Sequence, residues 1–123
     1  MLTFAELDKT VRLAEQMGSL DAGPVVLLNI FHVPPESLDA YSEWIQRTGL
    51  VMQRQPGYIS TQLHRGVGGS CTFFNYAVWE SIAAFKLAFT SGEFRAIAME
   101  CPDGTVGSPH LFHKVAMPGL CVA

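Results

Sequence analysis

The chain has few charged residues and no cluster of basic ones. Its 123 residues include 8 Lys and Arg against 11 Asp and Glu, for a formal net charge of −3. A protein that binds nucleic acid or an anionic membrane surface usually carries a basic patch. The composition therefore argues against nucleic acid and against a membrane as partners.

Cysteines and long apolar runs are also scarce. The three cysteines, Cys71, Cys101 and Cys121, are too scattered for a disulfide framework, and no Cys-x-x-Cys or His/Cys ligand spacing occurs. We therefore expect ordinary thiols and no metal site. No stretch reaches the roughly 18–20 apolar residues of a membrane span, and the N-terminus shows no basic region followed by an apolar block. These features predict a cytoplasmic protein.

Apolar residues, which make up 49% of the chain, are sufficient for one globular core at this length. Residues 2–17 carry the signals of an amphipathic helix. Thr3 and Glu6 have the spacing of a capping box, apolar residues recur at helical spacing as far as Met17, and Gly18 can end the helix. We expect residues 1–23 to be an N-terminal helical extension that packs across a partner subunit or the edge of a dimer.

The rest of the chain alternates between strand and helix patterns. The expected order is strand 25–32, a helix from Pro35 that stops before Gln55, strands 58–65 and 71–79, helix 81–90 with a short helix 93–100, and strand 110–117. This β-α-β-β-α-β order predicts an α+β, ferredoxin-like fold, with both helices on one face of an antiparallel sheet. Because the opposite face is also apolar, we expect a homodimer whose two sheets pack into an α+β barrel.

Two amides and an indole stand out among the apolar strand residues. Asn75 and Trp79 share one face of the 71–79 strand with Phe73, and Asn29 interrupts the 25–32 strand. A buried amide without hydrogen bonds costs roughly 1–3 kcal/mol, so each Asn must bind backbone or face a cavity. The first and third strands are neighbours in a ferredoxin-like sheet. We therefore expect Asn29, Asn75 and Trp79 to converge on one cavity on the helix-facing side.

These residues also have structural interpretations. A Trp at a strand end beneath a helix is more often a core anchor than a substrate contact, and the two roles can coexist in Trp79. His64 has the position of a half-exposed sheet residue, although a histidine is also the most usable general base in the chain. His110 and His113 would face opposite sides of a strand, which argues against a metal pair.

Several short motifs occur together in a recognisable order. They are Asn29, Gln55-Pro-Gly-Tyr-Ile59, Leu63-His-Arg65 and Tyr76-Ala-Val-Trp-Glu-Ser81 followed by Ala84-Phe85. In order and spacing they resemble the antibiotic biosynthesis monooxygenase family, whose members are small dimeric α+β barrel proteins. The resemblance covers about residues 24–116. It implies a family-like domain at 24–117, between the extension at 1–23 and a C-terminal tail at 118–123.

The resemblance separates the enzymes within that family. The haem-degrading members are similar at Asn29, but they carry a Trp and an axial His where this chain has Ala88 and Ala98. The resemblance therefore implies no haem ligand.

The quinone-forming members, which use no cofactor, are similar at Asn75 and Trp79, whose N–H groups can hydrogen-bond the oxygens of a phenolic substrate. Their Tyr and Arg correspond to Phe85 and Met99 here, and Arg95 lies one helical turn from the second position.

The resemblance implies a cofactor-independent monooxygenase that acts on a phenolic, quinol or other small conjugated aromatic substrate with dioxygen. Asn75 and Trp79 are the expected catalytic residues. The expected substrate contacts are Asn29, Phe73, Phe85, Phe89 and His64. The alternative is a non-catalytic dimeric barrel protein that binds a ligand or has a regulatory role. The absence of the Tyr and Arg at positions 85 and 99 favours that alternative.

Overall fold

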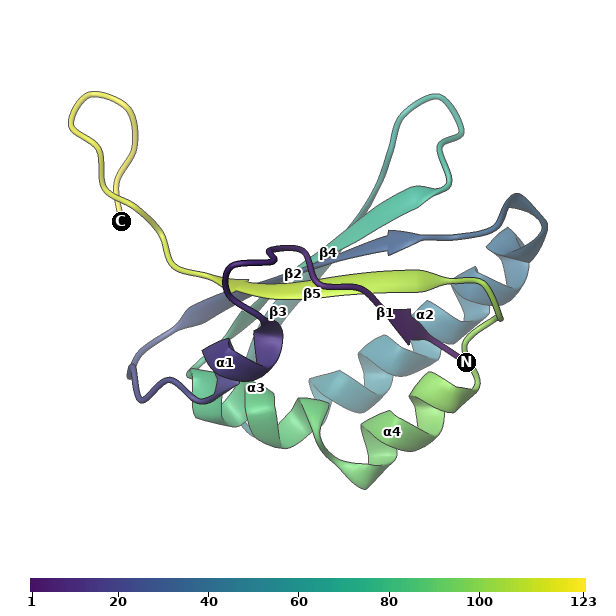
Figure 1. The fold of residues 1–123 in the computed structure, drawn as a ribbon, viewed down its shortest axis with the longest axis horizontal. Coiled ribbons are helices and arrows are strands. Elements are labelled where there is room, and N and C mark those ends of the chain that lie inside the picture. Colours follow the sequence, from purple (N-terminus) through teal and green to yellow (C-terminus); the bar gives the residue numbers. More distant parts are fainter.

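A sheet and a layer of helices face each other across the core (Figure 1). The computed structural model describes all residues 1–123. The strands are β1 (Thr3–Phe4), β2 (Val25–His32), β3 (Tyr58–Arg65), β4 (Thr72–Trp79) and β5 (Val106–Phe112). The helices are α1 (Leu13–Met17), α2 (Leu38–Gln53) after the 3₁₀ turn η1 (Pro35–Ser37), α3 (Ile82–Phe89) and α4 (Gly92–Met99). All four α-helices lie on the same side of the sheet.

The sheet confirms the ferredoxin-like prediction in its central part. Its order is β1-β5-β2-β4-β3. Strand β2 pairs antiparallel with both β4 and β5, and β3 pairs antiparallel with β4. The bounds predicted for β2 and β3 are those observed. The sheet of the single chain is open and does not close into a barrel.

The predicted helix over residues 2–17 is wrong. Thr3 and Phe4 instead form the edge strand β1, which runs parallel to β5 beside Val106 and Gly107. The backbone N–H of Leu2 donates to the Ala98 carbonyl at 2.9 Å. Because the Leu2 side chain is only 4% exposed, its burial and the strand pairing outweigh the local helix signals.

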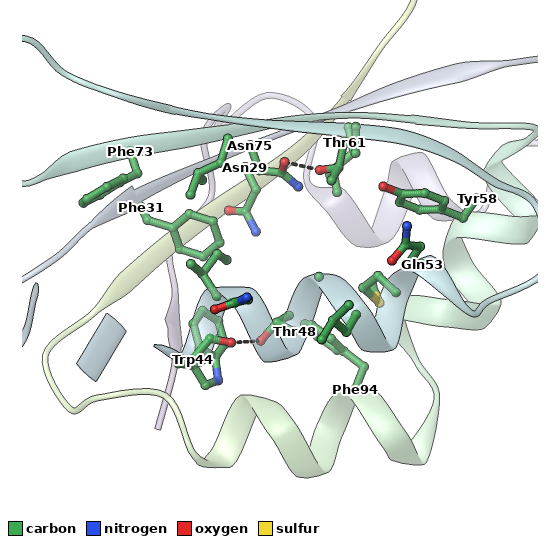
Figure 2. Close-up of a pocket in the computed structure, with 18 of the residues that line it drawn as sticks. Asn29, Phe31, Trp44, Thr48, Gln53, Tyr58, Thr61, Phe73, Asn75 and Phe94 are labelled. Carbon is green, nitrogen blue, oxygen red and sulfur yellow. Dashed lines mark hydrogen bonds between the residues drawn. The ribbon is translucent and has the colours of Figure 1, made fainter. Parts of the chain in front are cut away.

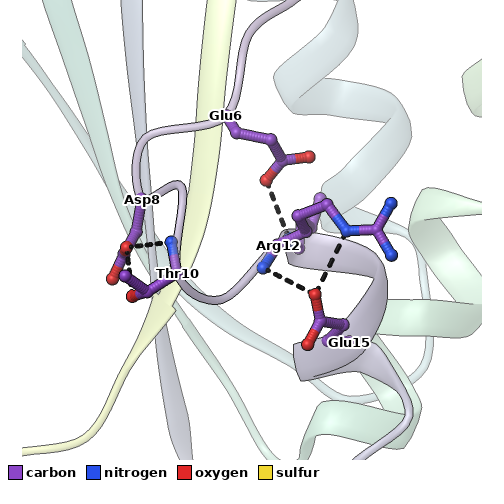
Figure 3. A network of polar contacts seen from close by, with 6 residues as sticks. Glu6, Asp8, Thr10, Arg12 and Glu15 are labelled. Carbon is purple, nitrogen blue, oxygen red and sulfur yellow. Dashed lines mark hydrogen bonds and ion pairs between the residues drawn. The ribbon is translucent and has the colours of Figure 1, made fainter.

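The last residues of the predicted helix do form a shorter helix, α1 (Figure 3). Glu6 does not cap Thr3, and its Oε1 accepts a hydrogen bond from the Leu13 backbone N–H at 2.8 Å. Glu15 Oε1 accepts from the backbone and side chain of Arg12 at 3.4 and 3.1 Å, which stabilises the start of α1. Leu13 is buried in the chain's own core. The N-terminal segment is therefore packed into the domain and is not a separate helical extension.

The last strand begins and ends earlier than predicted. It covers Val106–Phe112, and its first residues lie in a stretch that was expected to be a loop. Residues 113–123 extend away from the domain as an exposed segment. Gly107 and Pro109 have low strand propensity, so the sequence pattern gives no indication of a strand at these positions. Pro109 is tolerated because β1 pairs only with Val106 and Gly107, so at Pro109 the strand is on the edge of the sheet.

The turn between α2 and β3 requires a glycine. Gly57 has a φ of +87°, and a Cβ there would lie 2.4 Å from the Cβ of Ala84 on α3. Such a φ favours glycine. The tight packing fixes the point at which β3 enters the sheet, and hence the position of Tyr58.

The side chains on the two faces of the sheet differ in how deeply they are buried. The helix-facing side holds buried Leu27, Phe31, Phe73 and Ala77. The opposite side is also apolar but is only partly covered, and Tyr76 remains 38% exposed.

Candidate active site

A cavity of about 440 Å³ lies between the sheet and helix α2 (Figure 2). This volume is in the range of small-molecule sites. None of the side chains that line it is charged, and none is a histidine. Its aromatic wall consists of Phe31, Tyr41, Trp44, Tyr58, Phe73, Trp79, Phe85, Phe89 and Phe94. A flat, apolar ligand with few charges suits these walls.

Asn29, Asn75 and Trp79 all line this cavity, as predicted. The antiparallel register of β2 and β4 places Asn29 directly opposite Asn75. Trp79 follows on the same face because no bulge interrupts the β2–β4 ladder. Phe73, Phe85 and Phe89 line the cavity as well. The structure therefore brings these residues together at one cavity, and their roles in binding and catalysis stay predictions.

Trp79 and Asn29 have polar groups without partners in the chain. Trp79 is 1% exposed, and its Nε1 is buried with no hydrogen-bond acceptor. The Oδ1 of Asn29 is likewise buried and unpaired, and it lies so close to β5 that a Cβ at Gly107 would be 3.3 Å from it. The Nδ2 end of Asn29 is therefore the end that remains for the cavity. Because buried polar groups are almost always paired, the unpaired Trp79 Nε1 is a candidate for contact with a ligand.

Asn75 differs from Asn29 in having a partner. The hydroxyl of Thr61 on β3 donates to Asn75 Oδ1 (Figure 2). This leaves the Nδ2 group of Asn75, which forms no hydrogen bond within the chain, for the cavity.

Tyr58 belongs to the site, although simple alternation along β3 places it on the other face. The register shifts between Tyr58 and Ser60, so Tyr58, Thr61 and Leu63 all line the cavity. The Tyr58 ring packs edge-on against Trp79, with centroids 5.6 Å apart and planes at 89°. Burial raises the pKa of the Tyr58 phenol, and a side-chain hydrogen bond with Thr61 acts in the opposite direction. The phenol is therefore protonated at neutral pH and can donate a proton.

His64 lies on the outer face of the sheet and does not line the cavity. Its ring stacks on Phe74, with centroids 4.3 Å apart and an interplanar angle of 11°. The bulge near the start of β3 separates it from Tyr58, with which alternation had grouped it. A contact between His64 and a ligand in this cavity does not fit this geometry. Arg95 does not line the cavity either, and it is exposed on α4.

Helix α2 contributes a polar stripe that the sequence reasoning missed. Ser42, Gln46, Gly49 and Gln53 line the cavity at helical spacing, and the three polar side chains are solvent-exposed. They lie where the cavity opens to solvent, across from the sheet residues. On an amphipathic helix such residues look like an ordinary solvent face, so only the position of the cavity distinguishes them.

Two further aromatic residues of α2 differ in their polar contacts. Trp44 Nε1 donates to the Ile97 carbonyl at 2.7 Å, so its indole is satisfied within the core. The Tyr41 hydroxyl is buried and has no partner, and burial raises the pKa of this phenol far above its ordinary value. Trp79 is thus the tryptophan whose indole N–H has no partner in the chain.

No group of three or more His, Cys, Asp or Glu side chains is arranged to hold a metal ion. No helix has the length and apolarity needed to cross a membrane.

Comparisons with known proteins agree with this architecture. The antibiotic biosynthesis monooxygenase family model matches residues 24–99. No curated protein sequence matches the chain. A candidate monooxygenase from Shewanella loihica PV-4 is similar in structure at 32% identity and a TM-score of 0.68, over 79% of this chain and 99% of that one. SnoaB, a cofactor-independent oxygenase from Streptomyces nogalater, is similar at 25% identity and a TM-score of 0.67, over 80% of this chain and 99% of SnoaB. The family match and the shared fold together show that the chain belongs to the antibiotic biosynthesis monooxygenase family.

Proposed function

We propose that the protein is a cofactor-independent monooxygenase for a phenolic, quinol or other small conjugated aromatic substrate, with dioxygen as the second substrate. The observation that carries this proposal is the aromatic and uncharged cavity that Asn29, Asn75 and Trp79 line together, where the Trp79 N–H has no partner in the chain. The similarity to SnoaB, which is a cofactor-independent oxygenase, supports the same reaction class.

The chemistry needs little from the protein. An electron-rich phenolate can itself reduce dioxygen, so the site must bind it, orient it and exclude water. N–H donors aimed at the phenolic oxygen stabilise its negative charge strongly where water is excluded. The absence of carboxylates among the lining residues avoids repulsion of that anion.

The proposed reaction forms a quinone-type carbonyl. One atom of dioxygen bonds to the ring carbon, and the other leaves as water with two hydrogens from the substrate. Tyr58 is the phenol placed to protonate the departing oxygen, because the other candidate position on α3 is occupied by Phe85. Asn75 and Trp79 are proposed as the catalytic donors, with Asn29, Phe73 and Phe89 as substrate contacts.

Oxygen uptake tests the proposal. Chelator-treated protein is mixed with naphthohydroquinones and hydroxyanthrones, and oxygen consumption is recorded above the buffer rate. Loss of one oriented donor to an oxyanion lowers turnover by about 100- to 1,000-fold, so Asn75→Ala should fall in that range. Gln62→Ala, on the outer face of the same hairpin, is the control and should retain wild-type uptake.

Saturable binding of these compounds without oxygen uptake would refute the oxygenase and favour the alternative of a non-catalytic ligand-binding protein. The feature that favours this alternative is the presence of Phe85 and Met99 where the quinone-forming relatives have Tyr and Arg.

We also propose that the protein is a homodimer whose sheets pack through their outer faces. The support is the apolar character of that face, on which Tyr76 and Phe112 are 38% and 39% exposed. Tyr76→Glu should convert the dimer to a monomer in sedimentation velocity. Leu87→Glu, at a residue on α3 that is 75% exposed, should not. A wild-type monomer at micromolar concentration would contradict the dimer.

A further inference from the structure

We propose that Thr61 is a positioning residue that fixes the orientation of the Asn75 amide, so that its N–H₂ group and not its oxygen faces the cavity. The proposal extends the proposed function, because an oriented N–H₂ group matters most for a substrate oxygen that carries negative charge. It concerns a residue outside the motifs through which the chain resembles its family.

The contact arises from the register of the β3–β4 hairpin. Leu63 lies directly opposite Asn75, and Thr61 lies opposite Ala77, so Thr61 is the diagonal neighbour of Asn75. Diagonal neighbours on one face of an antiparallel pair are within side-chain reach. Thr61 donates its hydroxyl proton to Asn75 Oδ1.

An asparagine amide has two ends of nearly equal size and opposite hydrogen-bonding character. The Asn75 side chain has no other hydrogen-bond partner in the chain, so without Thr61 nothing polar in the protein distinguishes the two orientations. The inverted orientation would turn the oxygen lone pairs toward the cavity and repel a phenolate. The Thr61 contact selects the orientation that presents donors.

Thr61 needs its own proton to be directed at Asn75. A threonine hydroxyl donates one hydrogen bond and accepts others. In the structure this single proton is directed at Asn75 Oδ1.

A purely structural role for Thr61 makes a different prediction. Cross-strand polar pairs on exposed strands contribute modestly to stability, and a structural Thr61 would affect only stability. Thr61→Val keeps the shape and the β-branched side chain but removes the hydroxyl. Thr61→Ser keeps the hydroxyl and should therefore keep the orientation of the Asn75 amide. Ser60→Ala, at the neighbouring residue that faces away from the cavity, is the matched control.

The direct test is the side-chain amide signal of Asn75 in ¹H–¹⁵N spectra of the full-length protein, assigned by its absence in Asn75→Ala. We expect one sharp pair of signals in the wild type, in Thr61→Ser and in Ser60→Ala. In Thr61→Val the pair should shift and broaden or double, because both orientations become populated. Unchanged Asn75 signals in Thr61→Val would overturn the proposal, whether or not the protein consumes oxygen.

Oxygen uptake with a hydroxyanthrone supplies the second readout. Thr61→Val should lower kcat by about 5- to 30-fold, the equivalent of one hydrogen bond, with little change in KM. Thr61→Ser should stay within about 2-fold of the wild type on the same scale. A wild-type protein without oxygen uptake would refute the proposed function, while the amide signals would still decide the role of Thr61. An equal loss of kcat in Thr61→Ser and Thr61→Val would overturn the positioning role.

Discussion

Replacing Trp79 by Phe tests whether Trp79 is only a core residue or also a hydrogen-bond donor to the substrate. The indole is 1% exposed, packs edge-on against Tyr58 at 5.6 Å and Phe85 at 5.9 Å, and leaves its Nε1 unpaired. A smaller ring costs about 1–2 kcal/mol, a part of the roughly 3–5 kcal/mol for truncation of Trp to Ala. Removal of a buried unpaired N–H returns about 1–3 kcal/mol. We therefore expect the free energy of unfolding to fall by no more than about 1 kcal/mol.

Trp44→Phe is the matched comparison, because Trp44 is equally buried but donates to the Ile97 carbonyl at 2.7 Å. This substitution loses the same ring volume and also removes one hydrogen bond, although the Ile97 carbonyl still accepts from the Glu100 N–H at 3.0 Å. The expected cost is about 1.5–3.5 kcal/mol, the sum of roughly 1–2 kcal/mol for the volume and about 0.5–1.5 kcal/mol for the hydrogen bond.

The assay is urea unfolding followed by circular dichroism, together with oxygen uptake. If Trp79 is a substrate donor, Trp79→Phe should fold nearly as stably as the wild type but lose oxygen uptake by at least about 10-fold, since the donor acts on the developing charge. Destabilisation as large as that of Trp44→Phe, with oxygen uptake unchanged, would show that Trp79 is a core anchor and not a substrate donor.

Three further predictions concern stability. Leu2→Ala should lower the free energy of unfolding by about 2–5 kcal/mol, because Leu2 is 4% exposed. Leu20→Ala, at a residue that is 98% exposed, should leave the urea midpoint unchanged. Equal midpoints for the two variants would contradict the packing of the N-terminus against the domain. Tyr41→Phe should stabilise the protein at pH 7 by about 1 kcal/mol by removing an unpaired hydroxyl. Burial raises the Tyr41 pKa above its ordinary 10.0, so this group's contribution is constant below pH 10 and falls as pH rises further. The gain from Tyr41→Phe should therefore grow above pH 10 in urea titrations, and a constant gain would be inconsistent with the buried phenol. Gly57→Ala should destabilise by about 1–3 kcal/mol or more because of its positive φ, and a thermal midpoint equal to the wild type would contradict the close packing against Ala84.

The sequence predicts the central part of the site because alternation holds along β2 and β4. Asn29, Asn75 and Trp79 fall on one face, and no irregularity in the β2–β4 ladder reverses that face. The apolar runs and the Pro56-Gly57 turn likewise place β2, α2 and β3 correctly, because these signals are local.

The parts that the sequence did not predict depend on tertiary contacts. Tyr58 reaches the cavity through a bulge, and a bulge leaves no mark in an alternating pattern. The capping signals at Thr3 and Glu6 are genuine local preferences, but pairing with β5 and burial of Leu2 outweigh them. The start of the last strand was missed for a similar reason. Gly107 has a weak strand propensity, but pairing with β2 and β1 outweighs it.

The most direct test of the oxygenase proposal is the rate at which ¹⁸O from labelled dioxygen enters the product of a hydroxyanthrone, measured by mass spectrometry with chelator-treated protein. We expect one labelled oxygen atom per quinone product, formed well above the buffer rate by the wild type. Asn75→Ala should form it at least about 100-fold more slowly. A label incorporated no faster than in buffer alone, or equally fast by the wild type and Asn75→Ala, would contradict the assignment of this cavity as an oxygenase site.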